Sequence, residues 1–223
     1  MTIGETYLLS YEELNLIAAA SGRGSFLMFA SAGQKGREQQ LQSVFRLIND
    51  GLLTQTGEGI RPSPSLFPLL RAFKFATTAV AAKLSNCEGA PVCLYYGGRK
   101  NSFLRITPSL YKQDLYEVGL VELDTLLGDL ESSRFLPVLH DQDPIHDAAV
   151  PDDLPDDLAD SLAWKDNILS TFEKFDLSTK MLMESISIVQ TPFMWCLSSD
   201  TDCGKPVGYS KHSFTAWLNE EIK

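Results

Sequence analysis

The stretch that most constrains the fold is residues 91–130, where two β-rich runs, a turn and a leucine-rich run follow one another. The β-rich runs cover residues 91–96 and 102–107, and they contain the branched and aromatic side chains that favour strands. Between them, Gly-Gly-Arg-Lys-Asn at 97–101 is typical of a tight hairpin turn. Leucines then recur at helical spacing within residues 118–130. The stretch therefore predicts a strand, a turn, a strand and a helix.

A similar order returns near the C-terminal end of the chain. Residues 185–190 and 193–197 are strand-like, residues 200–206 are turn-like, and residues 213–222 have helical periodicity. A further β-rich run at 77–83 would extend the first hairpin into a three-stranded antiparallel meander. The repeated order predicts an α+β fold, with a central antiparallel sheet that two similar halves share and that helices flank.

An acidic segment separates the two predicted halves, which cover residues 1–135 and 161–223. Residues 136–160 carry four Pro, and Pro-Asp-Asp-Leu occurs twice in succession at 151–158. The segment also contains eight Asp and no Lys or Arg, so the net charge of −10 would be near −2 without it. Such a composition buries too little apolar surface to order itself. We expect a flexible linker here and a helix over about 158–175 after it.

Three helices and a hairpin are predicted before residue 77, where the three-stranded meander would begin. Ser10 and Glu13 form a capping-box pattern before a helix that Gly22 would end. Apolar residues at i, i+3, i+4 and i+7 predict a second helix, and they are Leu41, Val44, Phe45 and Ile48. Residues 52–62 would form a small hairpin or wing. The inward stripe of a third helix would consist of Leu66, Leu69, Leu70 and Phe73.

No residue pattern points to catalysis or to a cofactor. The chain lacks a Gly-x-Ser-x-Gly elbow and the phosphate-binding and dinucleotide-binding patterns. Side chains of metal-ligating types gather at His140, Asp141, Asp143, His146 and Asp147. They lie in the predicted linker, where no second shell would fix their geometry. We therefore predict that the protein is not an enzyme, and we expect no cofactor, no metal and no small-molecule ligand.

The N-terminal residues lack the basic start and the apolar run of a signal peptide, and no apolar stretch has the length of a membrane span. A cytoplasmic location is the expectation, without a membrane partner. The cysteines would then be structural thiols, and they are Cys87, Cys93, Cys196 and Cys203.

Nucleic acid is disfavoured as a partner, because phosphate contacts need clustered Lys and Arg. The helices and hairpin within residues 40–70 have the outline of a winged helix-turn-helix. Arg71 and Lys74 are, however, the only cations of the presumed recognition helix. A winged-helix regulator is therefore the least favoured alternative.

The predicted hairpin at 91–107 is the best candidate for a partner-binding surface. Tyr95, Tyr96, Arg99 and Lys100 lie on or beside its turn, and Tyr111 follows its second strand. Aromatic residues and Arg are enriched at protein interfaces. We select Tyr95, Tyr96, Arg99 and Lys100 as the candidate partner-binding residues.

Several segments of the N-terminal half resemble one protein family. They are Leu-Ser-Tyr-Glu-Glu-Leu at 9–14, Leu-Ile-Asn-Asp-Gly-Leu-Leu at 47–53 and Gly-Glu-Gly-Ile-Arg-Pro-Ser at 57–63. A leucine-rich helix, a β-meander and a helix follow them, and then a second half. This order is similar to that of the EspG-type chaperones of type VII secretion and of their relatives in Gram-positive bacteria outside the mycobacteria. The acidic linker has no counterpart in the resemblance.

The resemblance implies a central antiparallel sheet between two helical groups, with two quasi-repeated halves. It also implies a non-enzymatic protein that binds the end of a helical secreted substrate and keeps it soluble in the cytosol. The hairpin at 96–102 and the C-terminal helical group would then face the substrate. The alternative from another class is an immunity-type toxin inhibitor, whose acidic segment would steer it towards a basic active site.

Overall fold

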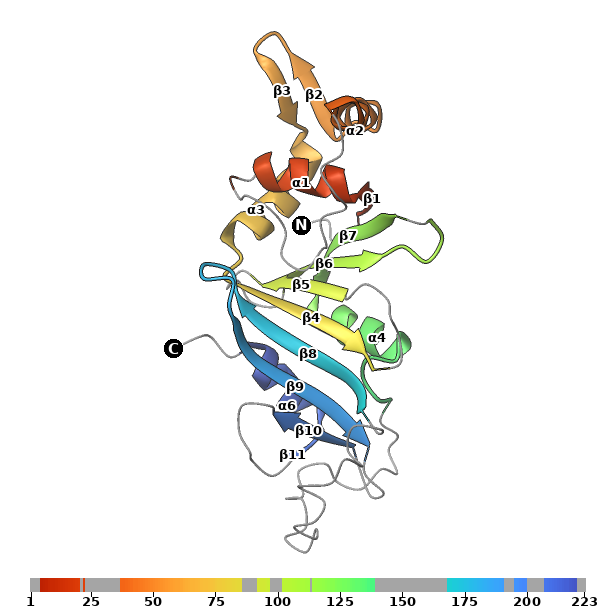
Figure 1. The fold of residues 1–223 in the computed structure, drawn as a ribbon, viewed down its shortest axis with the longest axis vertical. Coiled ribbons are helices and arrows are strands. Elements are labelled where there is room, and N and C mark those ends of the chain that lie inside the picture. Colours follow the sequence, from red (N-terminus) through yellow and green to blue (C-terminus); the bar gives the residue numbers. More distant parts are fainter. Residues whose placement is uncertain are drawn as a thin grey trace, which may run out of the picture. The chain divides into compact units, whose positions relative to one another are not determined.

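The computed structural model of the protein describes residues 5–20, 22, 37–85, 92–96, 102–112, 114–138, 168–190, 195–199 and 207–219. Figure 1 draws these residues as ribbons. They form an α+β fold that divides into two compact units. The first unit takes in residues up to Ala79, most of the region from Ala90 to Leu123, and Asp176–Lys180. Most of the remaining residues belong to the second unit.

The first unit contains a four-stranded antiparallel sheet in the order β1-β7-β6-β5. Its strands are β1 (Thr6–Ser10), β5 (Val92–Tyr96), β6 (Ser102–Pro108) and β7 (Leu115–Glu122). The antiparallel pairing of β5 with β6 confirms the hairpin predicted at 91–107.

Helices α1 (Tyr11–Ala20), α2 (Arg37–Asn49) and α3 (Phe67–Phe75) belong to the same unit. The hairpin of β2 (Leu53–Thr56) and β3 (Gly59–Pro62) lies between α2 and α3 in the chain, and the short 3-10 helix η1 (Pro64–Leu66) leads into α3. Helix α1 contacts both α2 and α3. The buried core includes Leu14 and Ile17 of α1, Leu47 of α2, Phe73 of α3 and Ile106 of β6.

Local signals predicted the ends of these helices correctly. The Ser10 backbone N–H donates to the Glu13 carboxylate at 2.7 Å, and the Glu13 N–H donates to Ser10 Oγ at 3.3 Å. These are the two reciprocal bonds of a capping box. After α1, Gly22 has φ +82° and donates its N–H to Ala19, as a left-handed C′ residue does. Gly51, with φ +71°, follows α2 in the same way.

The second unit contains the antiparallel strands β8-β9-β10-β11 and two helices. The strands are β8 (Ile168–Asp176), β9 (Leu182–Gln190), β10 (Trp195–Ser199) and β11 (Val207–Gly208). The helices are α4 (Leu123–Ser132) and α6 (Lys211–Asn219). Strand β4 (Thr78–Leu84), most of which belongs to this unit, confirms the strand predicted at 77–83.

Two predicted helices are wrong over part of their length. Residues up to Glu122 of the helix predicted at 118–130 belong to strand β7, and α4 begins only at Leu123. Leu120 fits both a helical spacing and a period of two, and hydrogen bonding of β7 to β1 on one edge and β6 on the other decides for the strand. The residues of the helix predicted at 158–175 that the structure describes, from Ile168 onwards, form strand β8.

Polar residues at buried positions explain the error in β8. The side chains of Ser170, Phe172 and Lys174 alternate along the strand and are all buried. Because two of these three are polar, a period of two in hydrophobicity is absent from the sequence even though a period of two in burial is present. Residues 139–160 of the predicted linker lie outside the described residues.

Candidate protein-binding site

Two of the four predicted binding residues, Tyr95 and Tyr96, lie in the described part of the chain. Tyr95 and Tyr96 are the last two residues of β5, where their backbones pair with Leu104 and Phe103 of β6. Arg99 and Lys100 lie outside the described residues. The prediction that these four side chains bind a partner therefore stays a prediction.

The opposite end of β6 leads into a second hairpin tip that has the surface character expected of a binding site. We define the β6–β7 tip as Ser109, Leu110, Tyr111, Lys112 and Asp114. Leu110 is 92% exposed and Tyr111 is 89% exposed, more than any other large hydrophobic side chain among the described residues. Single exposed apolar residues are common on protein surfaces, but two neighbouring ones at a projecting turn form a small apolar anchor.

Backbone and side-chain hydrogen bonds order the β6–β7 tip. The Ser109 N–H donates to the Leu115 carbonyl at 2.8 Å, and the Tyr111 N–H donates to Ser109 Oγ at 3.3 Å. The Ser109 hydroxyl in turn donates to the Glu117 carboxylate at 3.4 Å. Asp114 takes the left-handed conformation with φ +60°, which Asp tolerates better than most residues. Leu110 and Tyr111 are therefore held out by a defined turn.

The strands behind the tip are firmly packed. Phe103, Leu104 and Ile106 of β6 and Val118 of β7 have no exposed surface. A binding loop on a rigid support loses little conformational entropy when a partner docks. The β6–β7 tip therefore projects from a packed support.

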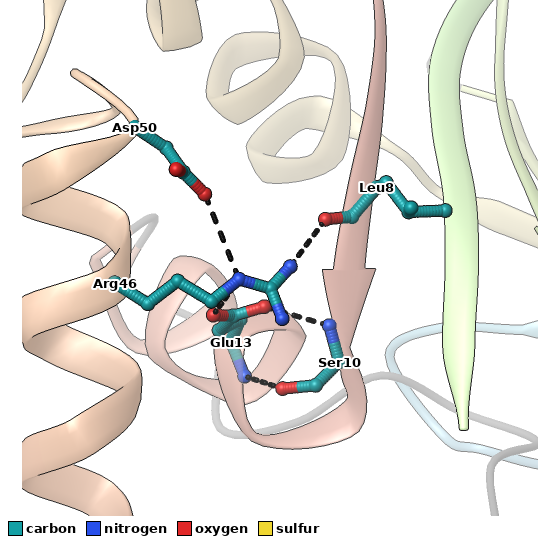
Figure 2. A network of polar contacts seen from close by, with 5 residues as sticks. All are labelled: Leu8, Ser10, Glu13, Arg46 and Asp50. Atoms are coloured by element: carbon teal, nitrogen blue, oxygen red, sulfur yellow. Dashed lines mark hydrogen bonds and ion pairs between the residues drawn. The ribbon is translucent and has the colours of Figure 1, made fainter. Parts of the chain in front are cut away.

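An ion pair between a buried carboxylate and a partly exposed guanidinium joins α2 to α1 and β1 in the same unit (Figure 2). Arg46 of α2 lies 3.3 Å from the Glu13 carboxylate, and its guanidinium also donates to the Leu8 carbonyl at 2.8 Å. Asp50 lies 3.6 Å from Arg46 Nε. Glu13 is buried, and its carboxylate also accepts the Ser10 N–H. These bonds use the Glu13 carboxylate and the Arg46 guanidinium for structure rather than for chemistry.

The second unit holds a buried tyrosine, Tyr209, whose pKa departs from its ordinary value. Burial, and secondarily the negative charge of Glu131, raise the pKa of the Tyr209 hydroxyl above its ordinary value. Lys211 forms an ion pair of 2.7 Å with Glu131. The raised pKa keeps this hydroxyl protonated at neutral pH. Three aromatic residues of the same unit, Phe172, Phe214 and Trp217, pack against one another in the core.

Over the described ranges, no group of three or more His, Cys, Asp or Glu side chains is arranged to hold a metal ion. The cluster from His140 to Asp147 lies outside those ranges. None of the described helices combines the length and the apolar character of a membrane span.

No protein-family model matches the chain. No curated protein matches it either.

Sequence reasoning identified one residue of the β6–β7 tip and missed the other. The sequence places Tyr111 after the second strand of the hairpin predicted at 91–107, but it predicts a helix at 118–130 and no second hairpin. Because Leu115–Glu122 is a strand, a hairpin turn precedes it, and Leu110 and Tyr111 of that turn project into solvent. The signal was present, since Leu110-Tyr111 interrupts an otherwise polar turn that begins with Pro108-Ser109.

Proposed function

We propose that this protein is a non-enzymatic cytoplasmic adaptor that binds another protein, and specifically a chaperone for a helical substrate of type VII secretion. The observation that carries the proposal is the ordered β6–β7 tip with its exposed Leu110 and Tyr111. A helical bundle offers few pockets, so projecting apolar and aromatic side chains suit its recognition.

The similarity of element order to the EspG-type chaperones supports the more specific part of the proposal. The proposal also includes a central sheet that is shared by two similar halves of the chain. In this function, Tyr95, Tyr96, Arg99 and Lys100 would contact the substrate from one end of β6. The β6–β7 tip would contact it from the other end.

The proposal is tested by identifying the neighbouring genes and by co-expression with any small helical proteins that they encode. The wild type should co-purify with one of them, and calorimetry on the isolated pair then gives a dissociation constant. Leu110→Ser with Tyr111→Ser should weaken binding by roughly tenfold or more, as loss of interface anchors does. Tyr96→Ala with Arg99→Ala should have an effect of similar size.

The melting temperature separates a binding defect from a folding defect. Leu110 and Tyr111 are almost fully exposed, so their replacement should leave the melting temperature nearly unchanged. Ile60→Ser, which removes an exposed apolar residue from β3, is the matched control and should bind normally. Unimpaired binding by both double variants would refute the proposal that these residues contact the substrate. Failure to co-purify with any helical neighbour would refute the chaperone function.

The toxin-inhibitor alternative is favoured by one observation, the run of eight Asp without a compensating cation in residues 136–160. Deletion of residues 141–157 should leave substrate binding by a chaperone intact. An inhibitor steered by this segment should instead lose association rate on deletion, most visibly at low salt.

A further inference from the structure

Helix α3 presents an exposed face on which aromatic and cationic side chains alternate. Phe67 is 55% exposed and Phe75 is 58% exposed, while Arg71 and Lys74 lie between them in the sequence and are also exposed. Steps of three and four residues place these four side chains along one side of a helix. The opposite side of α3, with Leu69 and Phe73, is buried in the core. We call the exposed side the α3 face.

The charge of the α3 face is opposite to that of the chain as a whole. Helix α3 contains no acidic residue, although the protein carries a net charge of −10. Lys74 Nζ lies 5.9 Å from the centre of the Phe75 ring, so the cationic and aromatic groups adjoin each other. A surface of this kind is complementary to a segment in which carboxylates alternate with apolar side chains.

We propose that the α3 face binds the Pro-Asp-Asp-Leu repeat, residues 151–158, of a second copy of this chain. The repeat lies outside the described residues, and its sequence supplies both kinds of group. It carries four Asp, with Leu154 and Leu158 spaced four residues apart.

The order of the groups is matched between the two partners. In α3, Phe67 and Phe75 lie on either side of Arg71 and Lys74 in the sequence. In the repeat, Leu154 and Leu158 lie on either side of Asp156 and Asp157. Each partner therefore carries a pair of charges between two apolar groups, and the charges of the two partners are opposite in sign.

A second copy is the occupant that makes the contact strong enough to persist. One α3 face offers only two rings and two cations, all of them accessible to solvent, so a single contact is weak and screened by salt. Each molecule carries one face and one repeat. Reciprocal exchange between two copies gives two contacts, the second of which forms within the complex and is therefore favoured.

A charge exchange tests this proposal. The first variant carries Arg71→Glu and Lys74→Glu, and the second carries Lys in place of Asp152, Asp153, Asp156 and Asp157. Each variant alone pairs like charges, so sedimentation velocity should find it monomeric where the wild type dimerises. An equimolar mixture of the two should dimerise again, because both of its contacts then join opposite charges.

A labelled peptide of residues 149–160 measures the contact directly. Its fluorescence anisotropy should rise on titration with the full chain, and the first variant should bind it roughly tenfold more weakly or worse, since attraction becomes repulsion. Phe67→Ser with Phe75→Ser should weaken it as well. Lys180→Glu, a charge reversal at another exposed lysine, is the control and should change neither binding nor dimerisation.

Three results would overturn the proposal. The first is a wild type that remains monomeric at all concentrations. The second is a mixture of the two charge variants that fails to dimerise although both are folded. The third is peptide binding that is insensitive to the charge of residues 71 and 74. Circular dichroism of each variant establishes that it is folded before these comparisons are made.

Discussion

The Glu13 carboxylate lies 3.3 Å from Arg46 Nε, although the side chain of Glu13 is only 1% exposed and that of Arg46 is 40% exposed. The pair therefore joins a buried anion to a cation that reaches it from the surface. Glu13 lies in the first turn of helix α1. Its carboxylate accepts the N–H of Ser10, the last residue of β1, and pairs with Arg46 of α2. Three elements of the first unit are positioned through it.

Replacement of Glu13 by Ala should be destabilising. The change removes the acceptor of the Ser10 N–H and one partner of Arg46. Arg46 stays partly exposed and keeps its contacts with Asp50 and the Leu8 carbonyl, so we expect a cost of about 2 kcal/mol. Urea unfolding measures this loss of unfolding free energy. Arg61→Ala, which breaks the exposed ion pair with Glu58, should cost less than about 1 kcal/mol. Equal costs for the two variants would show that the Glu13–Arg46 pair contributes little.

Replacement of Lys174 by Met should loosen helix α6. Lys174 is buried in β8, and its ammonium donates to the Trp217 carbonyl at 2.7 Å and lies 5.0 Å from the centre of the Trp217 ring. A carbonyl in the last turns of a helix lacks an intrahelical partner, and a cation there is favourable. Met retains the volume but not these bonds, so we expect a loss of about 2 kcal/mol. Hydrogen exchange of the α6 amides should accelerate.

Lys83→Met is the control for Lys174. Lys83 pairs with Glu173 at 2.8 Å, but its side chain is 47% exposed, so the loss should stay below about 1 kcal/mol. A cost for Lys174→Met no larger than that of Lys83→Met would contradict the assigned role.

Tyr209 should make the protein sensitive to alkali. Burial and the charge of Glu131 raise the pKa of Tyr209 above its ordinary value of 10.0. The unfolded chain therefore loses this proton at lower pH than the folded protein does. Stability that is present at neutral pH is then lost as the pH rises above about 10. Urea unfolding across this range measures the slope, which Tyr209→Phe should reduce.

At neutral pH the same Tyr209→Phe change should be nearly neutral or stabilising. Tyr209 is fully buried, and no hydrogen-bond partner for its hydroxyl is found in the part of the chain that the structure describes. Removal of such a hydroxyl releases a desolvation cost rather than a bond. A loss of more than about 2 kcal/mol at pH 7 would imply that the hydroxyl does have a partner.

Gly119 should resist enlargement, because β1 approaches it closely. A Cβ at this position of β7 would lie 3.3 Å from the Glu5 carbonyl oxygen and 3.4 Å from Thr6 Oγ1. Gly119→Val should cost about 2 kcal/mol and accelerate hydrogen exchange in β1, since the added methyls displace backbone. Gly128→Ala is the control. Nothing surrounds that helical position, so the change should stabilise the protein by roughly 0.5–1 kcal/mol.

Signals carried by neighbouring residues predicted much of the fold. The capping box at Ser10 and Glu13, the stops at Gly22 and Gly51, and the strand pairing of 92–96 with 102–108 depend on groups only a few residues apart. The inward stripe of α3 was also predicted, since Leu66, Leu69 and Phe73 are buried. Strand β7 was not predicted because one of its two neighbours in the sheet is β1, about a hundred residues away in the sequence.

The candidate binding site was less accessible from sequence than the fold. The exposure of a side chain depends on which other parts of the chain pack over it. The spacing of apolar residues alone does not determine which side of a helix is buried. Phe45, which helped to predict α2, is 62% exposed, while Leu47 is the α2 residue that is fully buried. Leu110 was not predicted as a binding residue for a related reason. It lies in a hairpin turn because residues 115–122 form a strand, and the sequence did not predict that strand.

The bond from Arg46 to the Leu8 carbonyl has a consequence for solubility. Among the described strands, β1 pairs only with β7, and a strand edge with free carbonyls is a template on which other chains assemble. The Arg46 guanidinium occupies a carbonyl at the middle of β1, where an incoming strand would need it. It also places a positive charge at that edge, which deters edge-to-edge assembly. We therefore expect Arg46, which joins α2 to β1, also to oppose aggregation through this strand edge.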